Sequence, residues 1–191
     1  HELPYVKSLL KRFDAVSVRE HEAVKICKDV FDVEATQVLD PVFLCGHKHW
    51  SILEQNALRK TEGDFLFAYM LDPTEEKAKE LGELSKFLGL KPVCITDRQT
   101  NRIAKQEILK DYGIIDNANL EEFIYHIKNA KFVITDSFHG YCFSLIFKRP
   151  FLVLVNRVRG GSRFDTLSNI TGSGERLIES MEHWKRYTID E

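Results

Sequence analysis

Several familiar sequence signatures are missing from this chain of 191 residues. It contains neither the phosphate-binding loop G-x-x-x-x-G-K-S/T nor the dinucleotide-binding motif G-x-G-x-x-G, which argues against ordinary nucleotide hydrolases and dehydrogenases. No apolar run approaches the ~20 residues that are needed to span a bilayer. The formal net charge is only -2, so we expect no bulk electrostatic attraction to nucleic acid or to an anionic membrane.

The amino terminus has neither an initiator methionine nor a basic, apolar signal peptide. We therefore expect an excised or processed piece of a cytoplasmic protein, either free or peripheral to the inner face of the membrane. The cysteines form no C-x-x-C pair, and we expect no structural zinc site. Because each lies in an apolar stretch, buried free thiols are favoured over disulfides. These cysteines are Cys27, Cys45, Cys94 and Cys142.

Strands and helices alternate along most of the chain. Apolar runs of strand length occupy 65–71, 91–97, 131–137 and 150–156. Helical periodicity or helical tendency fills the segments 74–88, 98–112, 120–130 and 139–148, and a further helix is expected at 162–170. This alternation predicts βαβ units with right-handed crossovers, and hence an α/β fold with a doubly wound, Rossmann-like parallel sheet.

Local signals mark some of the expected boundaries. Thr74 is a candidate N-cap for the helix that follows the first of these strands, and Gly89 is expected to end that helix. The polar stretch KTEGD at 60–64 is the best candidate for a linker. The amino-terminal part adds a short strand at 15–18 and a helix at 19–31.

The strand ending at 137 leads into the most informative polar segment. In open α/β sheets, ligands bind outside the carboxyl ends of the strands. Ser137, His139 and Gly140 lie between this apolar strand and an apolar helix, where unsatisfied N–H groups attract anions. His139 adds a side chain that titrates near neutral pH. The structural alternative is that Ser137 only caps the helix and that His139 packs inside.

A second anion-binding candidate follows the last of these strands. Asn156, Arg157, Arg159 and Arg163 flank the turn Gly160-Gly161-Ser162. Bidentate arginines and backbone amides of such a loop can hold a phosphate or a carboxylate. A flexible basic loop whose serine caps the next helix is the alternative.

Two isolated features complete the candidates. Arg19 follows the strand at 15–18 and opens a helix, so it can meet an anion, although taken alone it is typical of a surface arginine. His47 and His49 form an H-x-H pair without a third ligand nearby, so a solvated helix start is favoured over a metal site.

Four stretches resemble the polysaccharide pyruvyl transferase family. They are AVSVRE at 15–20, VLDPVFL at 38–44, AKFVITDSFHGYCFSLIFKRPF at 130–151 and NRVRGGSRFDTL at 156–167. The resemblance implies a GT-B-like enzyme with two doubly wound domains that face a cleft. It makes residues 1–45 the tail of a preceding domain or an amino-terminal extension. Residues 46–191 are then the Rossmann-like ligand-binding domain, truncated at its end.

The resemblance also implies an activity. Members of the family transfer pyruvate from phosphoenolpyruvate to a sugar or lipid-linked glycan of a bacterial exopolysaccharide, usually as a ketal. Carried over residue by residue, the motif histidine corresponds to His139, the expected catalytic group, and a donor-binding arginine to Arg19. Better-studied members have an arginine two positions before the histidine, where this chain has Ser137. Arg157, Arg159 or Arg163 are the candidates to replace that charge. No cofactor or metal is implied.

Two other functions remain open at this stage. A glycosyltransferase of the same architecture would place the diphosphate of a nucleotide-sugar at the same helix N-terminus. A non-catalytic glycan-binding domain would retain the fold without the donor site, and Ser137 keeps this alternative open. For either enzyme we expect the chain alone to be inactive, because a cleft needs both of its walls and the amino-terminal domain is missing.

Overall fold

The computed structural model describes residues 2–96, 102–155, 157 and 160–186, and it divides the chain into two compact units. Unit 1 combines the residues up to Leu44 with Arg157–Gly174. Unit 2 combines Cys45–Asn156 with the residues from Glu175 onward. The linker expected at 60–64 therefore lies inside unit 2 rather than between the units.

Unit 1 is built from short elements. They are α1 (Leu3–Leu10), β1 (Ser17–Val18), α2 (His21–Asp29), β2 (Thr36–Gln37), a 3-10 turn (Pro41–Leu44) and α8 (Ser162–Thr171). The two strands pair in parallel. Although α8 is far away in the sequence, the Ser162 hydroxyl donates to Glu20 at 2.7 Å and the His21 amide lies 3.4 Å from the Thr166 hydroxyl oxygen. Long-range polar contacts thus place α8 in unit 1, whereas the sequence-based division assigned its residues to the second domain.

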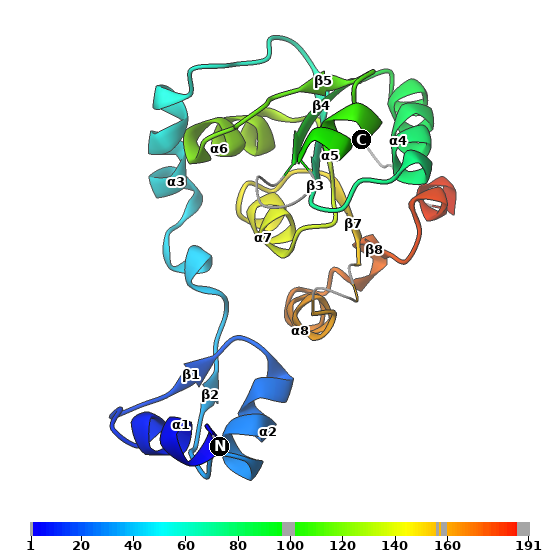
Figure 1. Ribbon diagram of the computed structural model, residues 1–191. Coiled ribbons are helices and arrows are strands. Elements are labelled where there is room, and N and C mark those ends of the chain that lie inside the picture. The colour runs from blue at the N-terminus through cyan, green and yellow to red at the C-terminus, as the bar shows by residue number, and fades with distance from the viewer. Residues whose placement is uncertain (1, 97–101, 156, 158–159, 187–191) are drawn as a thin grey trace. The chain divides into compact units, whose positions relative to one another are not determined.

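Unit 2 contains a six-stranded parallel sheet in the order β5-β4-β3-β6-β7-β8 (Figure 1). Its strands are β3 (Phe65–Met70), β4 (Lys91–Thr96), β5 (Gly113–Ile114), β6 (Phe132–Thr135), β7 (Phe151–Leu154) and β8 (Leu177–Ile178). Its helices are α3 (His47–Leu53), α4 (Glu75–Leu88), α5 (Arg102–Ile108), α6 (Leu120–Asn129) and α7 (Phe138–Ile146). Short 3-10 segments occupy Glu54–Asn56, Gly174–Arg176 and Met181–Arg186.

The strand order reverses direction once, between β3 and β6. From β3 the chain winds outward to β5, and from β6 it winds the opposite way to β8. With right-handed crossovers, α4 and α5 cover one face of the sheet, while α6 and α7 cover the other. This confirms the predicted doubly wound, Rossmann-like sheet, whose ligand crevice is expected at the reversal point.

β3 shows why the sheet is buried on both faces. Leu66, Ala68 and Met70 belong to one apolar cluster together with residues of α4. The alternate residues Phe67 and Tyr69 face the other layer, where both form edge contacts with Phe123 of α6, with ring centroids 6.1 and 4.9 Å apart. Since both faces need apolar side chains, the strand is a nearly continuous apolar run rather than an alternating one.

The local boundary signals are confirmed. The Thr74 hydroxyl caps α4 by accepting from the Lys77 amide at 3.2 Å, and Gly89 ends the helix in the left-handed conformation with φ 65°. The cysteine prediction holds for Cys27, Cys94 and Cys142, which are buried free thiols, and burial raises the pKa of Cys94 to about 12. It is wrong for Cys45, which is exposed because it follows the 3-10 turn that ends unit 1.

Gly140 in the first turn of α7 is required by packing. A Cβ atom at this position would lie 2.3 Å from Oγ1 and 2.9 Å from Cβ of Thr135, the last residue of β6. Both contacts are far below van der Waals distance, and Thr135 is fully buried, so neither side has room to move. The glycine thus sets how closely α7 approaches the end of β6.

We expect Gly140→Ala to lower the free energy of unfolding by about 1–3 kcal/mol, the usual cost of overpacking a core. Urea unfolding followed by circular dichroism measures this difference. Gly174→Ala is the matched control, because a Cβ atom there meets nothing within 4 Å, and it should change stability little. Equal stability of the Gly140 variant and the wild type would contradict the packing argument.

Candidate functional site

The carboxyl ends of β3 and β6 meet at the reversal point of the sheet and are held together by Asp136. Its side chain is 1% exposed and accepts from the backbone amides of Leu71 at 2.6 Å and Asp72 at 3.1 Å. The Lys77 ammonium adds a third contact at 3.0 Å. Amides after the first strand of a doubly wound sheet commonly receive an anionic ligand. Here the Asp136 carboxylate already accepts the hydrogen bonds of the Leu71 and Asp72 amides. A ligand at this edge of the sheet must therefore bind to other groups.

The start of α7 supplies those other groups. Ser137 is the N-cap, and its hydroxyl lies 3.4 Å from the Gly140 amide. The Ser137 amide itself donates to the Thr135 hydroxyl at 3.0 Å, and that hydroxyl donates to the Tyr69 carbonyl at 2.7 Å. Ser137 and Gly140 are buried, and their hydrogen bonds are made within the protein. Both residues therefore help to position α7.

His139 differs from its neighbours because its side chain is exposed, while Phe138 and Gly140 on either side are buried. The imidazole lies in the first turn of α7, next to the carboxyl end of β6 and one strand away from the end of β3. Its ring makes an edge contact with Phe138 at a centroid distance of 5.9 Å. The histidine is therefore accessible at the edge where doubly wound folds bind ligands.

Two of the arginines singled out after the last expected strand, Arg157 and Arg163, belong to unit 1. Arg157 is exposed and forms an ion pair with Asp165 at 3.0 Å. Arg163, in the first turn of α8, is half-buried, and its guanidinium carbon lies 5.6 Å from the centre of the Phe164 ring. Asn156 and Arg159 lie outside the described residues.

Arg19 sits in a compact acidic setting within unit 1. Its guanidinium pairs with the buried carboxylate of Asp40, and its Nε lies 3.7 Å from Glu20. Glu20 in turn accepts from the Ser162 hydroxyl at 2.7 Å. An anion that binds Arg19 must therefore compete with Asp40, whose side chain is only 5% exposed.

Searches for two other kinds of feature give no candidates within the described ranges. No group of three or more histidine, cysteine, aspartate and glutamate side chains is arranged to hold a metal ion. None of the helices described has the length and apolar character that crossing a membrane requires.

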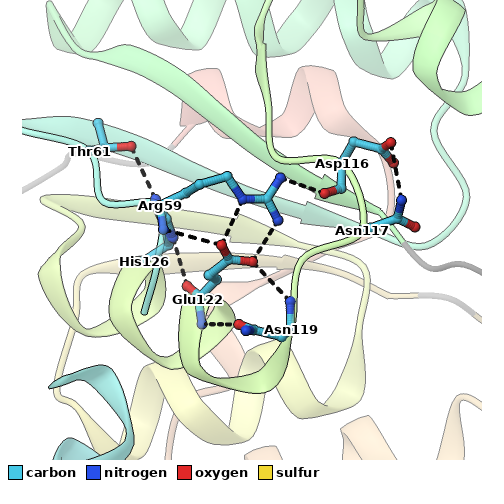
Figure 2. A network of polar contacts seen from close by, with 7 residues as sticks. All are labelled: Arg59, Thr61, Asp116, Asn117, Asn119, Glu122 and His126. Carbon is cyan, nitrogen blue, oxygen red and sulfur yellow. Dashed lines mark hydrogen bonds and ion pairs between the residues drawn. The ribbon is translucent and has the colours of Figure 1, made fainter. Parts of the chain in front are cut away.

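An ion pair between the half-exposed Arg59 and the buried carboxylate of Glu122 was missed by the sequence reasoning. Arg59 grips the Glu122 carboxylate with two parallel bonds, from Nε and Nη2, each 2.7 Å long (Figure 2). Its third nitrogen, Nη1, donates to the Asp116 carbonyl at 2.6 Å. Glu122 also completes a capping box with Asn119 at the start of α6. The capping box is readable in the sequence from the spacing N-x-x-E, but its partner 63 residues away is not.

His126, one turn further along α6, extends this network. Its Nδ1–H donates to the Glu122 carbonyl at 2.6 Å, which leaves Nε2 as the acceptor for the Thr61 hydroxyl at 3.1 Å (Figure 2). Burial lowers the pKa of His126, consistent with a neutral ring whose exposed fraction is 0%. Because Tyr125 also donates to the Thr61 carbonyl, at 2.9 Å, the segment expected to be a linker is fastened to α6.

The network is structural. Hydrogen bonds from the Arg59 guanidinium lower the pKa of Glu122 from 4.5 to about 2, against the opposing effect of burial. Glu122 is 2% exposed, and all of the described partners come from the protein itself. Unlike this network, the edge at His139 presents an exposed side chain to a ligand.

The strand order and the accessible first turn of α7 together define a Rossmann-like domain with a candidate ligand site at the reversal point of its sheet. The model of one protein family, described as polysaccharide pyruvyl transferase, matches residues 1–157. The chain belongs to this family, as its sequence motifs indicated. A comparison with curated proteins finds no significant match.

Several solved structures are similar to parts of this chain. UDP-GlcNAc 2-epimerase from Methanocaldococcus jannaschii is 16% identical, with a TM-score of 0.48 over 75% of this chain and 43% of its own. The wall teichoic acid polymerase TagF is 14% identical, with a TM-score of 0.48 over 79% and 40%. UDP-GlcNAc 2-epimerase from Neisseria meningitidis is 16% identical, with a TM-score of 0.41 over 65% and 39%. The chain thus spans less than half the length of these proteins.

We expect Glu122→Gln to lower the free energy of unfolding at pH 7 by roughly 2 kcal/mol, because the half-exposed Arg59 guanidinium loses the charged acceptor of its hydrogen bonds. The carboxylate has a lowered pKa, so its stabilising effect is complete above pH 4.5 and is lost as the pH falls toward about 2. The difference between wild type and variant should therefore shrink over that range in urea unfolding. Glu121→Gln, at a partly exposed neighbour, is the control. A difference that is independent of pH would refute this account.

Proposed function

We propose that the protein transfers pyruvate from phosphoenolpyruvate to hydroxyl groups of a glycan, with His139 as the catalytic acid. Membership of the polysaccharide pyruvyl transferase family supports this reaction class. The observation that carries the assignment is the position of His139, the accessible side chain in an otherwise buried stretch at the reversal point of the sheet.

The proposed chemistry needs one proton donor and an anion site. Proton transfer from His139 to the methylene carbon of phosphoenolpyruvate generates an oxocarbenium-like centre at the adjacent carbon. A glycan hydroxyl attacks that carbon, the C–O bond to the phosphate breaks, and inorganic phosphate leaves. A second hydroxyl of the same sugar then closes the ketal. General acid catalysis of this kind is worth about 10²–10⁴ in rate.

The donor carries both a phosphate and a carboxylate, and so it needs several cationic or N–H donors. We assign Arg19, Arg157, Arg159 and Arg163 as candidate ligands for these charges, with Asn156 as a polar neighbour. The described ion pairs of Arg19 with Asp40 and Arg157 with Asp165 mean that a bound anion must displace a carboxylate. Ser137 and Gly140 are assigned a positioning role. Ser137 caps α7, and Gly140 allows α7 to pack closely against the end of β6.

A nucleotide-sugar glycosyltransferase is the competing function, because a diphosphate suits the same edge of a doubly wound sheet. Thermal-shift measurements on the intact protein distinguish the two donors. A rise of the melting temperature with phosphoenolpyruvate but not with UDP-sugars or CDP-glycerol supports pyruvyl transfer, and the reverse pattern supports glycosyl transfer. Glycan binding without any donor binding would indicate a non-catalytic domain.

We expect His139→Ala in the intact protein to lower kcat for pyruvyl transfer about 100-fold or more, because the proton donor is lost. Release of inorganic phosphate from phosphoenolpyruvate, measured with a glycan acceptor, follows the reaction. The matched control is His49→Ala, which removes another exposed histidine of unit 2 that lies outside this edge.

Circular dichroism separates a chemical effect from misfolding. His139 is exposed, so its replacement by alanine should leave the unfolding midpoint close to that of the wild type. A folded His139→Ala variant with normal turnover would eliminate the catalytic role.

A further inference from the structure

A pocket of about 460 Å³ lies in unit 2 at the ends of α6 and α7. Its polar lining consists of His47, Lys128, Asn129, Lys148 and Arg149, and its apolar lining includes Phe147. Lys128 and Asn129 precede β6, while Lys148 and Arg149 precede β7. Because these strands are parallel, the pocket lies at their amino ends, opposite to the edge that carries His139. It is therefore separate from the proposed catalytic site.

The lining has an excess of positive charge. Lys128 pairs with the Glu54 carboxylate, which also accepts from the Asn129 side chain at 3.1 Å. The Arg149 Nε donates to the Phe147 carbonyl at 3.1 Å, a bond that leaves its charge uncompensated. Among the described salt bridges, none includes Lys148 or Arg149. Two cations of the lining, Lys148 and Arg149, thus have no carboxylate among their described partners.

Lys148 occupies a backbone conformation that normally selects glycine. Its φ is 52°, and the turn has the bonds of a Schellman motif, from Lys148 N to Leu145 O at 3.1 Å and from Arg149 N to Ser144 O at 3.0 Å. The helices α4 and α8 end in left-handed glycines, Gly89 and Gly172. A lysine here costs backbone energy that glycine would avoid.

Helix dipoles alone do not explain this arrangement. Cations near the carboxyl ends of helices are favourable, and Lys128 and Lys148 meet that description. That interaction is available from any exposed position of the last turn, however, and needs neither a pocket nor a strained residue. A concave surface with an excess of cations suits an anion, and a ligand for the Lys148 side chain would explain why a lysine is retained at a position that favours glycine.

We propose that this pocket binds a phosphoryl group, held by the side chains of Lys148 and Arg149 with His47 and Lys128 at its margin. Arginine provides a planar fork for phosphate oxygens, and lysine provides a mobile ammonium. The volume accommodates a diphosphate or the head of a phosphorylated glycan carrier. The backbone strain at Lys148 is then retained because the side chain has a ligand.

The test combines binding and stability in one variant. Lys148→Gly removes the ammonium and relieves the left-handed backbone, so it should raise the urea midpoint of unfolding while weakening the binding of inorganic pyrophosphate at least 10-fold by calorimetry. Arg149→Ala should weaken binding similarly without the gain in stability. Each of the two effects of Lys148→Gly has its own control. Lys86→Ala removes the charge of an exposed lysine in α4, and Asn117→Gly relieves the backbone strain at another residue with φ 52°. Neither should alter binding.

A second set of probes distinguishes a soluble phosphorylated ligand from a membrane headgroup as the source of the phosphoryl group. Saturable binding of pyrophosphate in solution indicates a soluble phosphorylated ligand, and binding only to phosphatidylglycerol vesicles, not to phosphatidylcholine vesicles, indicates a membrane headgroup. Either result supports the site if Lys148→Gly abolishes it. Absence of binding to both probes, or binding that Lys148→Gly leaves unchanged, overturns the proposal. Pyruvyl transfer by the Lys148 variant is a separate measurement, so failure here does not bear on His139.

Discussion

The junction between β3 and β6 determines where the candidate catalytic edge lies. Two successive residues hold it together: Thr135 bonds to the Tyr69 carbonyl, and Asp136 receives the amides that follow β3. Thr135 also packs directly against Gly140, so it sets the approach of α7. Because His139 lies in that first turn, the contacts of its buried neighbours fix where its backbone lies.

The polar network around Arg59 and Glu122 stabilises a different part of unit 2, the start of α6. α6 must carry the chain from β5 at one edge of the sheet back to β6 beside β3. Its first turn is fixed by the pair of Arg59 and Glu122, which spans 63 residues of sequence. An unpaired carboxylate with 2% exposure would be costly, but four of the described hydrogen bonds satisfy this group. Three of them come from Arg59 and one comes from the Asn119 amide.

Most of the fold of unit 2 is readable from the sequence because its signals are local. The apolar run at 65–71 and the capping residue Thr74 report contacts within a few residues, and both predictions hold. The two-residue strands β5 and β8 carry no such signal, because pairing with a neighbour defines them. Two features of the candidate site could not be predicted from the sequence. They are the exposure of the His139 side chain and the ion pair of Arg19 with Asp40, which lies 21 residues further along the chain.

The cations of this chain fall into two electrostatic classes, and the difference bears on what they can bind. Arg19 and Arg157 of unit 1 already face carboxylates, so an anion gains only the difference between itself and the displaced partner. Lys148 and Arg149 have no carboxylate among their described partners, so an anion there displaces water rather than a charged group. Selectivity is thus expected where a carboxylate must be displaced, and affinity for phosphate where none competes.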